Sequence, residues 1–410
     1  MNSTTNQLPR LLYLGDVPVE ASYHGSALIY RLLQNYPAAK LRIIEGNLRN
    51  SLPERRLAGV RYGSVKVGWA RPLNTRLNRW ARLVYSYAAG WKANAVGHAL
   101  GNLQPEAVLT VAHDFLWLTA ARYAQKHSLP LHLICHDDWP RLAPVPLVFC
   151  NRLEREFMKV YRQAVSCLCV SPYMAEEYER RYGAKSTVLY PSRDPNTPVF
   201  EAISGGDCKN GHKFTVAYAG SLATSDYVRQ LVVMSQFLSD LGGKLLLFGP
   251  FDEKMLKTAG MNLASIIVGG MLSSADLVRR LHLDADVLFL PMSFADSELE
   301  AMALNFPSKL TDYTAAALPL LIWGPENCSA AKWAASEAGV AAVVTKPEPR
   351  NMATMLKKLM DNHGWRKELA ATAARVGNKY FSPTAASDIF LSSLTSFETK
   401  NFVPTRSHAH

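Results

Sequence analysis

The 410-residue sequence lacks several features that would mark common classes of protein. No run approaches the roughly 18 consecutive apolar residues that cross a bilayer, so a membrane-spanning helix is not expected. Residues 1–10 are polar and lack the charged and apolar regions of a signal peptide. The six cysteines show neither a paired framework nor metal-ligand spacing. We therefore expect a reduced, cytoplasmic compartment.

Three motifs of well-known sites are also absent. No Gly-x-Gly-x-x-Gly follows an expected strand, and no Gly-x4-Gly-Lys-Ser/Thr occurs anywhere in the chain. No serine or cysteine lies in a nucleophile elbow. These absences argue against a dinucleotide-binding domain, a P-loop and a hydrolase with such an elbow.

Acidic residues are scarce in one half of the chain. The net charge is +11, and residues 1–190 hold 24 Lys/Arg against 13 Asp/Glu, whereas residues 191–410 hold 21 of each. The excess peaks between Arg42 and Lys92. Aromatic residues are interleaved there: Trp69, Trp80, Tyr85, Tyr87 and Trp91. One interpretation is a solvated basic face with its aromatic side chains turned inward. The other is a surface for an anionic membrane, a phosphorylated acceptor or nucleic acid, and the one-sided charge favours an anionic partner.

What is present is a regular alternation of strand and helix patterns. A chain of 45.4 kDa is too long for one ordinary core. Residues 191–213 are rich in Pro, Gly, Asn and Asp and resemble an interdomain linker. The alternation predicts an α/β fold with two doubly wound parallel-sheet domains, at 1–190 and 214–382. A helix at 383–397 and a polar tail at 398–410 follow.

Local boundaries follow from the same patterns. In the basic region we expect a strand around Val65–Val67 and a long helix from about Leu73. We further expect a helix at Pro172–Tyr182 and a strand at Lys244–Phe248.

The most informative segment follows an apolar run, Asp286–Pro291, which reads as a buried parallel strand. Lys309 and Asp312 lie in a short helical stretch after it, on one face of the first turn. Open α/β sheets bind ligands beyond the carboxyl ends of their strands. A cation at such a place suits a phosphate, and a carboxylate suits a pair of ribose hydroxyls. The segment therefore predicts nucleotide-sugar binding.

Three other expected strands end in small residues: Gly220-Ser221, Gly249-Pro250 and Gly269-Gly270. Each alone is typical of a turn, but glycines on one sheet edge let a ligand approach the backbone. Together with the lysine and the aspartate they predict a donor pocket. Its expected residues are Gly220, Ser221, Gly249, Gly270, Met271, Pro307, Ser308, Lys309 and Asp312.

Histidines mark the strand ends of the first half. His24-Gly25 lies where a loop meets a helix, and it could be a capping turn with an exposed histidine or could hold a substrate hydroxyl or phosphate. His113 and His136 each end an expected strand and are each followed by aspartate. The spacing of these His-Asp pairs fits no compact ligand set, so no metal is expected. We predict that His136 contacts the transferred group and that His24, Gly25 and His113 bind the acceptor.

Over about residues 10–395 the chain resembles the GT-B glycosyltransferases, in particular the retaining family 4. The matching segments occur in the order and at the spacing of that family. They are the His24-Gly25 loop, the strand ends Val111–His113 and Ile134–His136, Leu168–Tyr178, Leu189–Ser192, Tyr218–Leu222, Leu247–Gly249, Asp286–Pro291 and Phe306–Tyr313.

The resemblance implies two Rossmann-like domains facing a cleft, with a nucleotide diphosphate held by the C-terminal one. Asp312 falls on the second acid of the family's Glu-x7-Glu, which contacts the ribose, whereas the first acid is replaced by Leu304. Lys309 takes the diphosphate, and His136 and Lys309 become the catalytic residues. The helix at 383–397 is expected to pack back on the N-terminal domain. No cofactor is expected beside the nucleotide-sugar donor, and the lack of a paired acid and base fits a family in which the leaving diphosphate is stabilised electrostatically.

The expected function is transfer of a sugar, with retention, from a nucleotide-diphosphate donor to a polysaccharide, glycolipid or lipid-linked acceptor. The alternatives are a GT-B sugar-nucleotide epimerase or phosphorylase, and a non-catalytic nucleotide-sugar-binding homologue. The expected location is cytoplasmic. A peripheral contact with anionic membrane through the basic region 42–92 is a further expectation, and no nucleic acid is expected as a partner.

Overall fold

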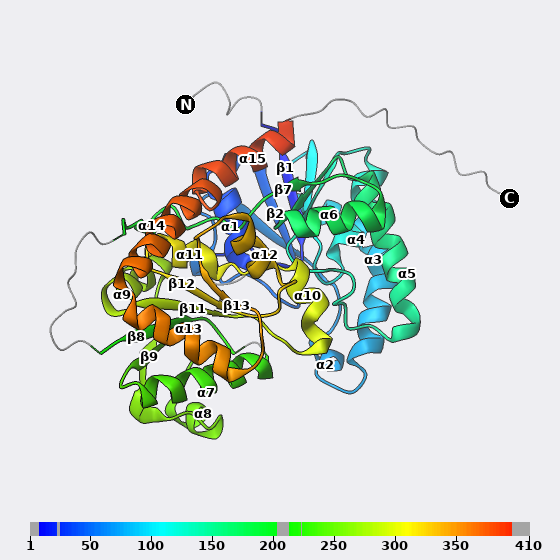
Figure 1. The fold of residues 1–410 in the computed structure, drawn as a ribbon. Coiled ribbons are helices and arrows are strands. Elements are labelled where there is room, and N and C mark those ends of the chain that lie inside the picture. The colour runs from blue at the N-terminus through cyan, green and yellow to red at the C-terminus, as the bar shows by residue number, and fades with distance from the viewer. Residues whose placement is uncertain (1–7, 23–24, 203–212, 223, 396–410) are drawn as a thin grey trace. The chain divides into compact units, whose positions relative to one another are not determined.

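The computed structural model describes residues 8–22, 25–202, 213–222 and 224–395 (Figure 1). The chain divides into two compact units, one of Met1–Leu189 with Ser387–His410 and one of Tyr190–Ala386. Each unit is built on a sheet of parallel strands, which confirms the predicted pair of doubly wound α/β domains. Among the described residues, no helix is long and apolar enough to cross a bilayer.

The first unit holds a seven-stranded sheet in the order β3-β2-β1-β4-β5-β6-β7. The strands are β1 (Leu11–Gly15), β2 (Leu41–Gly46), β3 (Arg61–Val65), β4 (Ala107–Val111), β5 (Leu131–Cys135), β6 (Ser166–Cys169) and β7 (Thr187–Val188). The helices are α1 (Gly25–Leu33), α2 (Ala70–Leu73), α3 (Asn78–Leu100), α4 (Leu116–Lys126), α5 (Cys150–Gln163) and α6 (Pro172–Tyr182), with short 3-10 turns η1 (Ala38–Lys40), η2 (Pro53–Arg55) and η3 (Leu147–Phe149). The chain order reverses between the adjacent strands β1 and β4, which is where doubly wound sheets bind ligands.

The second unit holds a six-stranded sheet in the order β10-β9-β8-β11-β12-β13. The strands are β8 (Thr215–Ala219), β9 (Lys244–Phe248), β10 (Ile266–Gly270), β11 (Val287–Pro291), β12 (Leu320–Trp323) and β13 (Ala342–Val344). The helices are α7 (Ser225–Asp240), α8 (Glu253–Thr258), α9 (Ser274–Asp284), α10 (Leu299–Leu304), α11 (Lys309–Ala315), α12 (Ser329–Ser336), α13 (Pro349–Asp361) and α14 (His363–Tyr380), with η4 (Leu263–Ser265) and η5 (Asp296–Glu298). The last helix, α15 (Pro383–Thr395), begins in this unit and belongs to the first unit from Ser387 onward. Here the reversal lies between β8 and β11.

Local signals explain where several elements begin. Helix α6 starts as predicted because the Ser171 side chain accepts the Met174 amide and Pro172 occupies the first turn. The expected strand at Val65–Val67 is wrong, since β3 ends at Val65. The reason is a side-chain contact: Asn47 Oδ1 accepts the Val67 amide at 2.6 Å, so that amide is unavailable for pairing in the sheet. The long helix α3 then begins only at Asn78.

Candidate functional site

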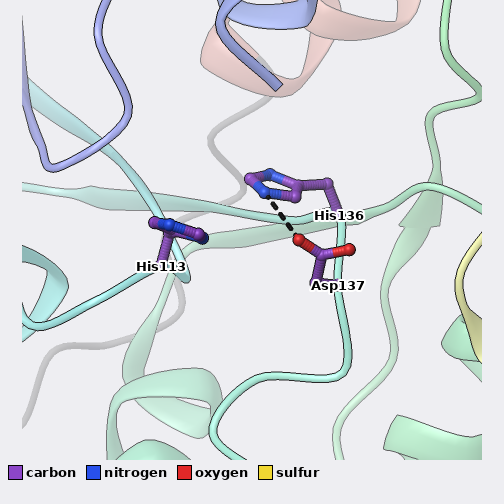
Figure 2. A group of neighbouring side chains, drawn as sticks. All are labelled: His113, His136 and Asp137. Carbon is purple, nitrogen blue, oxygen red and sulfur yellow. Dashed lines mark ion pairs between the residues drawn. The ribbon is translucent and has the colours of Figure 1, made fainter. Parts of the chain in front are cut away.

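The two histidines of the first unit come together because their strands are neighbours. His113 follows β4 and His136 follows β5, and these strands pair in parallel. The imidazole rings are stacked with centroids 5.6 Å apart. His136 Nε2 lies 3.1 Å from Oδ2 of Asp137, and Figure 2 shows this ring edge turned toward the carboxylate.

The electrostatics of this group favour a negative Asp137 beside a neutral His113. Burial would raise the pKa of Asp137, but the hydrogen bond from His136 and the nearby histidines leave that pKa below its ordinary value. Burial lowers the pKa of His113, against the opposing charge of Asp114. Both histidines keep a buried Nδ1 with no hydrogen-bond partner among the described residues. These nitrogens could bind a substrate hydroxyl.

The same group also has the geometry of a metal site. His113, His136 and Asp137 each offer one ligand atom, and these atoms lie within 4.8 Å of one another. These three side chains therefore form a compact ligand set, contrary to the expectation from the spacing of the His-Asp pairs. The expectation that the protein binds no metal stays a prediction.

Asp16 also lies at the carboxyl edge of this sheet, although it was not among the predicted site residues. It follows β1, and its Oδ2 accepts the backbone amides of Phe115 at 2.9 Å and Leu116 at 2.7 Å, which fixes the start of α4. Burial and then the charge of Asp114 raise the pKa of Asp16 to about 7. An aspartate directly after the first strand was the available signal.

The predicted acceptor residues are only partly described. A Cβ placed on Gly25 would lie 3.5 Å from Nε2 of His136, so the start of α1 is close to that imidazole. His24 lies outside the described residues. The acceptor role of His24, Gly25 and His113 stays a prediction.

In the second unit three glycines form a tight backbone edge. Gly220 donates its amide to the Phe248 carbonyl at 2.8 Å, and Gly249 donates to the Gly270 carbonyl at 2.9 Å. The φ angles of the three glycines are +143°, +145° and +72°, a region that other residues rarely adopt. A Cβ on Gly249 would lie 2.2 Å from the Gly220 carbonyl oxygen. The strand ends of β8, β9 and β10 are therefore brought together as the sequence predicted.

Lys309 lies directly against this edge. It is the first residue of α11, and a Cβ on Gly220 would lie 2.3 Å from its Cε. Its ammonium lies 5.3 Å from the Tyr218 ring centroid and 5.8 Å from that of Tyr227. Burial lowers the pKa of Lys309 to about 8. No ion pair or hydrogen bond holds its Nζ within the described part of the chain. A half-buried cation without a counter-ion favours the binding of an anion.

Tyr313 fixes the position of α11 against the sheet. Its hydroxyl donates to the Phe289 carbonyl of β11 at 3.1 Å and accepts the Ala219 amide of β8 at 2.8 Å. The ring is buried. These contacts fix the helix that carries Lys309 at the junction of the two central strands.

Asp312 has a neighbour, Arg193, that no sequence pattern predicts. Arg193, within the expected linker, is buried and donates to the Thr311 carbonyl at 3.1 Å and the Thr314 hydroxyl at 3.0 Å. Burial lowers the pKa of Arg193 to about 10, and the charge of Asp312 opposes that shift. Asp312 therefore also balances a buried guanidinium.

The remaining predicted donor residues lie around the same edge. Ser221 accepts the Tyr218 hydroxyl on its carbonyl at 2.6 Å. Met271 directly follows β10 and is exposed. Pro307 and Ser308 directly precede α11. Their contacts with a donor stay predictions.

Comparisons with known proteins agree with this architecture. Residues 29–197 match the model of Glycosyltransferase Family 4. No curated protein matches the chain. Among solved structures, Anabaena Alr3699/HepE in complex with UDP-glucose has 13% identity and a TM-score of 0.65, covering 95% of this chain and 100% of its own.

Two further structures show the same fold. WaaG, a glycosyltransferase involved in lipopolysaccharide biosynthesis, has 14% identity and a TM-score of 0.60, covering 93% of this chain and 99% of its own. Sucrose-phosphate synthase from Thermosynechococcus elongatus has 12% identity and a TM-score of 0.65, covering 92% and 96%. The chain therefore has the GT-B fold of two parallel-sheet domains, distant in sequence from its structural neighbours, and its residues 29–197 are similar to Glycosyltransferase Family 4.

Proposed function

We propose that the chain is a glycosyltransferase that takes its sugar from a nucleoside diphosphate donor bound at the strand ends of the second unit. The observation that carries the proposal is Lys309, a half-buried cation with no anionic partner among the described residues, packed against Gly220. A diphosphate supplies the missing charge, and glycine lets it approach the backbone. The fold neighbour HepE, whose structure contains UDP-glucose, supports this class of donor.

In the reaction Lys309 stabilises the negative charge that develops on the leaving diphosphate. The backbone around Gly220, Ser221 and Gly249 lines the phosphates, with Gly270, Met271, Pro307 and Ser308 at the rim of the pocket. Asp312 contacts the ribose hydroxyls. These roles need no paired general acid and base in this unit, because Lys309 balances the negative charge on the leaving diphosphate.

We further propose that His136 contacts the transferred sugar, oriented by the hydrogen bond to Asp137. His113, Gly25 and His24 bind the acceptor, a polysaccharide, glycolipid or lipid-linked sugar, and the new bond forms with retention.

The basic region 42–92 is proposed to contact anionic membrane at its cytoplasmic face. Residues 55–105 contain nine Lys/Arg and no Asp/Glu. Arg71, Arg76 and Arg79 are exposed, whereas Arg82 is paired with Asp114 and is not free for a lipid. Each exposed cation near an anionic bilayer contributes ~1 kcal/mol.

The test is a calorimetric titration with UDP, GDP, ADP and CDP, followed by incubation with the sugar donors of whichever base binds. We expect one diphosphate to bind and to raise the melting temperature, because a ligand at ~100 times its Kd adds about 2.7 kcal/mol. Transfer to an acceptor supports the proposal. An epimerised sugar, a sugar phosphate, or binding without any product would instead favour the alternative functions, and no binding at all would contradict the donor site.

A further inference from the structure

Helix α3 has two apolar faces. Its inward face, with buried Ala89, Ala93 and Val96, packs in the first unit beside α4 (Figure 1). A second row, spaced alternately three and four residues apart, lies on the outward face. This aromatic stripe comprises Leu77 (63% exposed), Trp80 (54%), Val84 (61%), Tyr87 (48%) and Trp91 (83%).

The stripe overturns the interpretation in which the aromatics turn inward. Of the five aromatic residues interleaved in the basic region, Tyr85 is buried, whereas Trp69 and the three on the stripe are exposed. A row of large apolar side chains left in water is costly for a monomeric soluble protein and marks a surface that something covers.

A second element extends the surface. In η3, Leu147 is 80% exposed and Val148 is 81% exposed. The next residue, Phe149, contacts Trp80 edge to face with centroids 6.1 Å apart. Arg152 lies 4.1 Å from the Tyr87 ring centroid. The stripe and these two η3 residues therefore form one surface, which we call the α3–η3 face.

The charge around this face indicates what covers it. Arg71, Arg76 and Arg79 are exposed beside the start of α3, in the stretch of residues 55–105 that has no acid. A second copy of the chain would bring like charges together. Tryptophan, tyrosine and arginine are the side chains that favour the headgroup layer of a bilayer, with rings among the headgroups and guanidiniums on phosphates.

We propose that the α3–η3 face inserts into the interfacial layer of an anionic bilayer. The stripe and η3 enter the headgroup region, and Arg71, Arg76 and Arg79 bind lipid phosphates. The inference deepens the membrane contact proposed above by making insertion of apolar side chains, as well as charge, the source of affinity.

The experiment is flotation of the full chain with vesicles of phosphatidylcholine alone or with 30% phosphatidylglycerol, a composition chosen at roughly the anionic level at which surface potential matters. We expect wild type to float with the anionic vesicles. Trp80→Ser/Trp91→Ser should lower the partition coefficient between anionic vesicles and water about 100-fold. Each large side chain that the bilayer no longer buries accounts for roughly tenfold. Leu283→Ser, at an apolar residue of the other unit about as exposed as Trp80, is the control and should float like wild type.

The charge contribution has its own pair of variants. Arg76→Glu/Arg79→Glu should reduce flotation, whereas Lys254→Glu/Lys257→Glu, at the same spacing on α8, should not. Quenching of tryptophan fluorescence by brominated lipid chains reports insertion directly, and we expect it in wild type and Leu283→Ser but not in Trp80→Ser/Trp91→Ser.

If Trp80→Ser/Trp91→Ser floats as well as wild type, the proposed insertion is wrong. It is also wrong if wild type binds vesicles and brominated lipid does not quench its tryptophan fluorescence. Concentration-dependent dimerisation that Trp80→Ser abolishes, in a chain that ignores vesicles, would assign the face to a second copy instead. Calorimetric titration of each variant with the nucleoside diphosphate separates the membrane proposal from the donor-site proposal. Intact nucleotide binding in a chain that ignores lipid contradicts the membrane inference alone.

Discussion

The carboxyl edges of the two sheets have the same backbone architecture and opposite chemistry. In the first unit the edge carries side chains that already have partners there: His136 with Asp137, and Arg82 with Asp114. In the second unit the edge is mostly glycine, and Lys309 packs there against Gly220 and the rings of Tyr218 and Tyr227, with no ion pair among the described residues. A parallel sheet places loops where ligands bind, but the side chains on those loops decide which ligand. The first edge suits hydroxyl groups and the second an anion.

The sharpest test of this division is His136→Ala. We expect turnover to fall about 100-fold, in the range found when one preorganised polar group is removed, while nucleotide affinity changes little. Steady-state kinetics and calorimetry on the same preparation make the comparison. His127→Ala, an exposed histidine of the same unit, is the control. Equal losses of turnover and nucleotide affinity would indicate a structural histidine and break the contrast between the edges.

Lys309→Ala should produce the converse result. A hydrogen bond to a charged group contributes about 1.5–3 kcal/mol, so nucleoside diphosphate affinity should fall roughly 10- to 150-fold. Calorimetry measures it, and Lys257→Ala, an exposed lysine of the same unit, should leave it unchanged. Lys309→Arg tests geometry, since it keeps the charge. Wild-type affinity in a folded Lys309→Ala protein would remove the donor-site assignment.

Asp312→Ala separates a ribose contact from a structural one. If the carboxylate binds ribose, affinity for the diphosphate falls about tenfold with little change in the melting temperature. If it serves mainly to balance Arg193, the melting temperature falls and affinity does not. We expect the first result, with a small decrease in stability. Thermal unfolding together with titration of the nucleoside diphosphate and of free pyrophosphate decides between them, because only the former offers a ribose.

The pH dependence of donor binding should be the mildest effect. Lys309 is protonated below its lowered pKa of about 8, and only the ammonium form attracts phosphate. Affinity should therefore be full near pH 7 and fall severalfold by pH 9, because the cation is lost as pH rises through that pKa. Lys309→Arg should flatten the profile. A wild-type profile that stays level to pH 10 would show that the lysine keeps its ordinary pKa.

Local sequence determined much of the fold. Helix α6 and strand β9 lie at the predicted residues because their signals are short-range: Ser171 and Pro172 begin the helix, and the strand is a run of apolar residues. Glycines at the strand ends could also be recognised, since positive φ is a property of single residues. The alternation of strands and helices was enough to predict parallel sheets.

Tertiary structure decided the rest. Strand order places β8 beside β11, and this brings Gly220 against Lys309 across nearly ninety residues of chain. Burial of Arg193 next to Asp312 is likewise a long-range contact that no pattern in the linker announces. The stripe on α3 gives the clearest case. Periodicity shows which residues share a face of a helix, but only packing determines which of two apolar faces meets the core, because hydrophobic burial depends on the neighbours that a face finds.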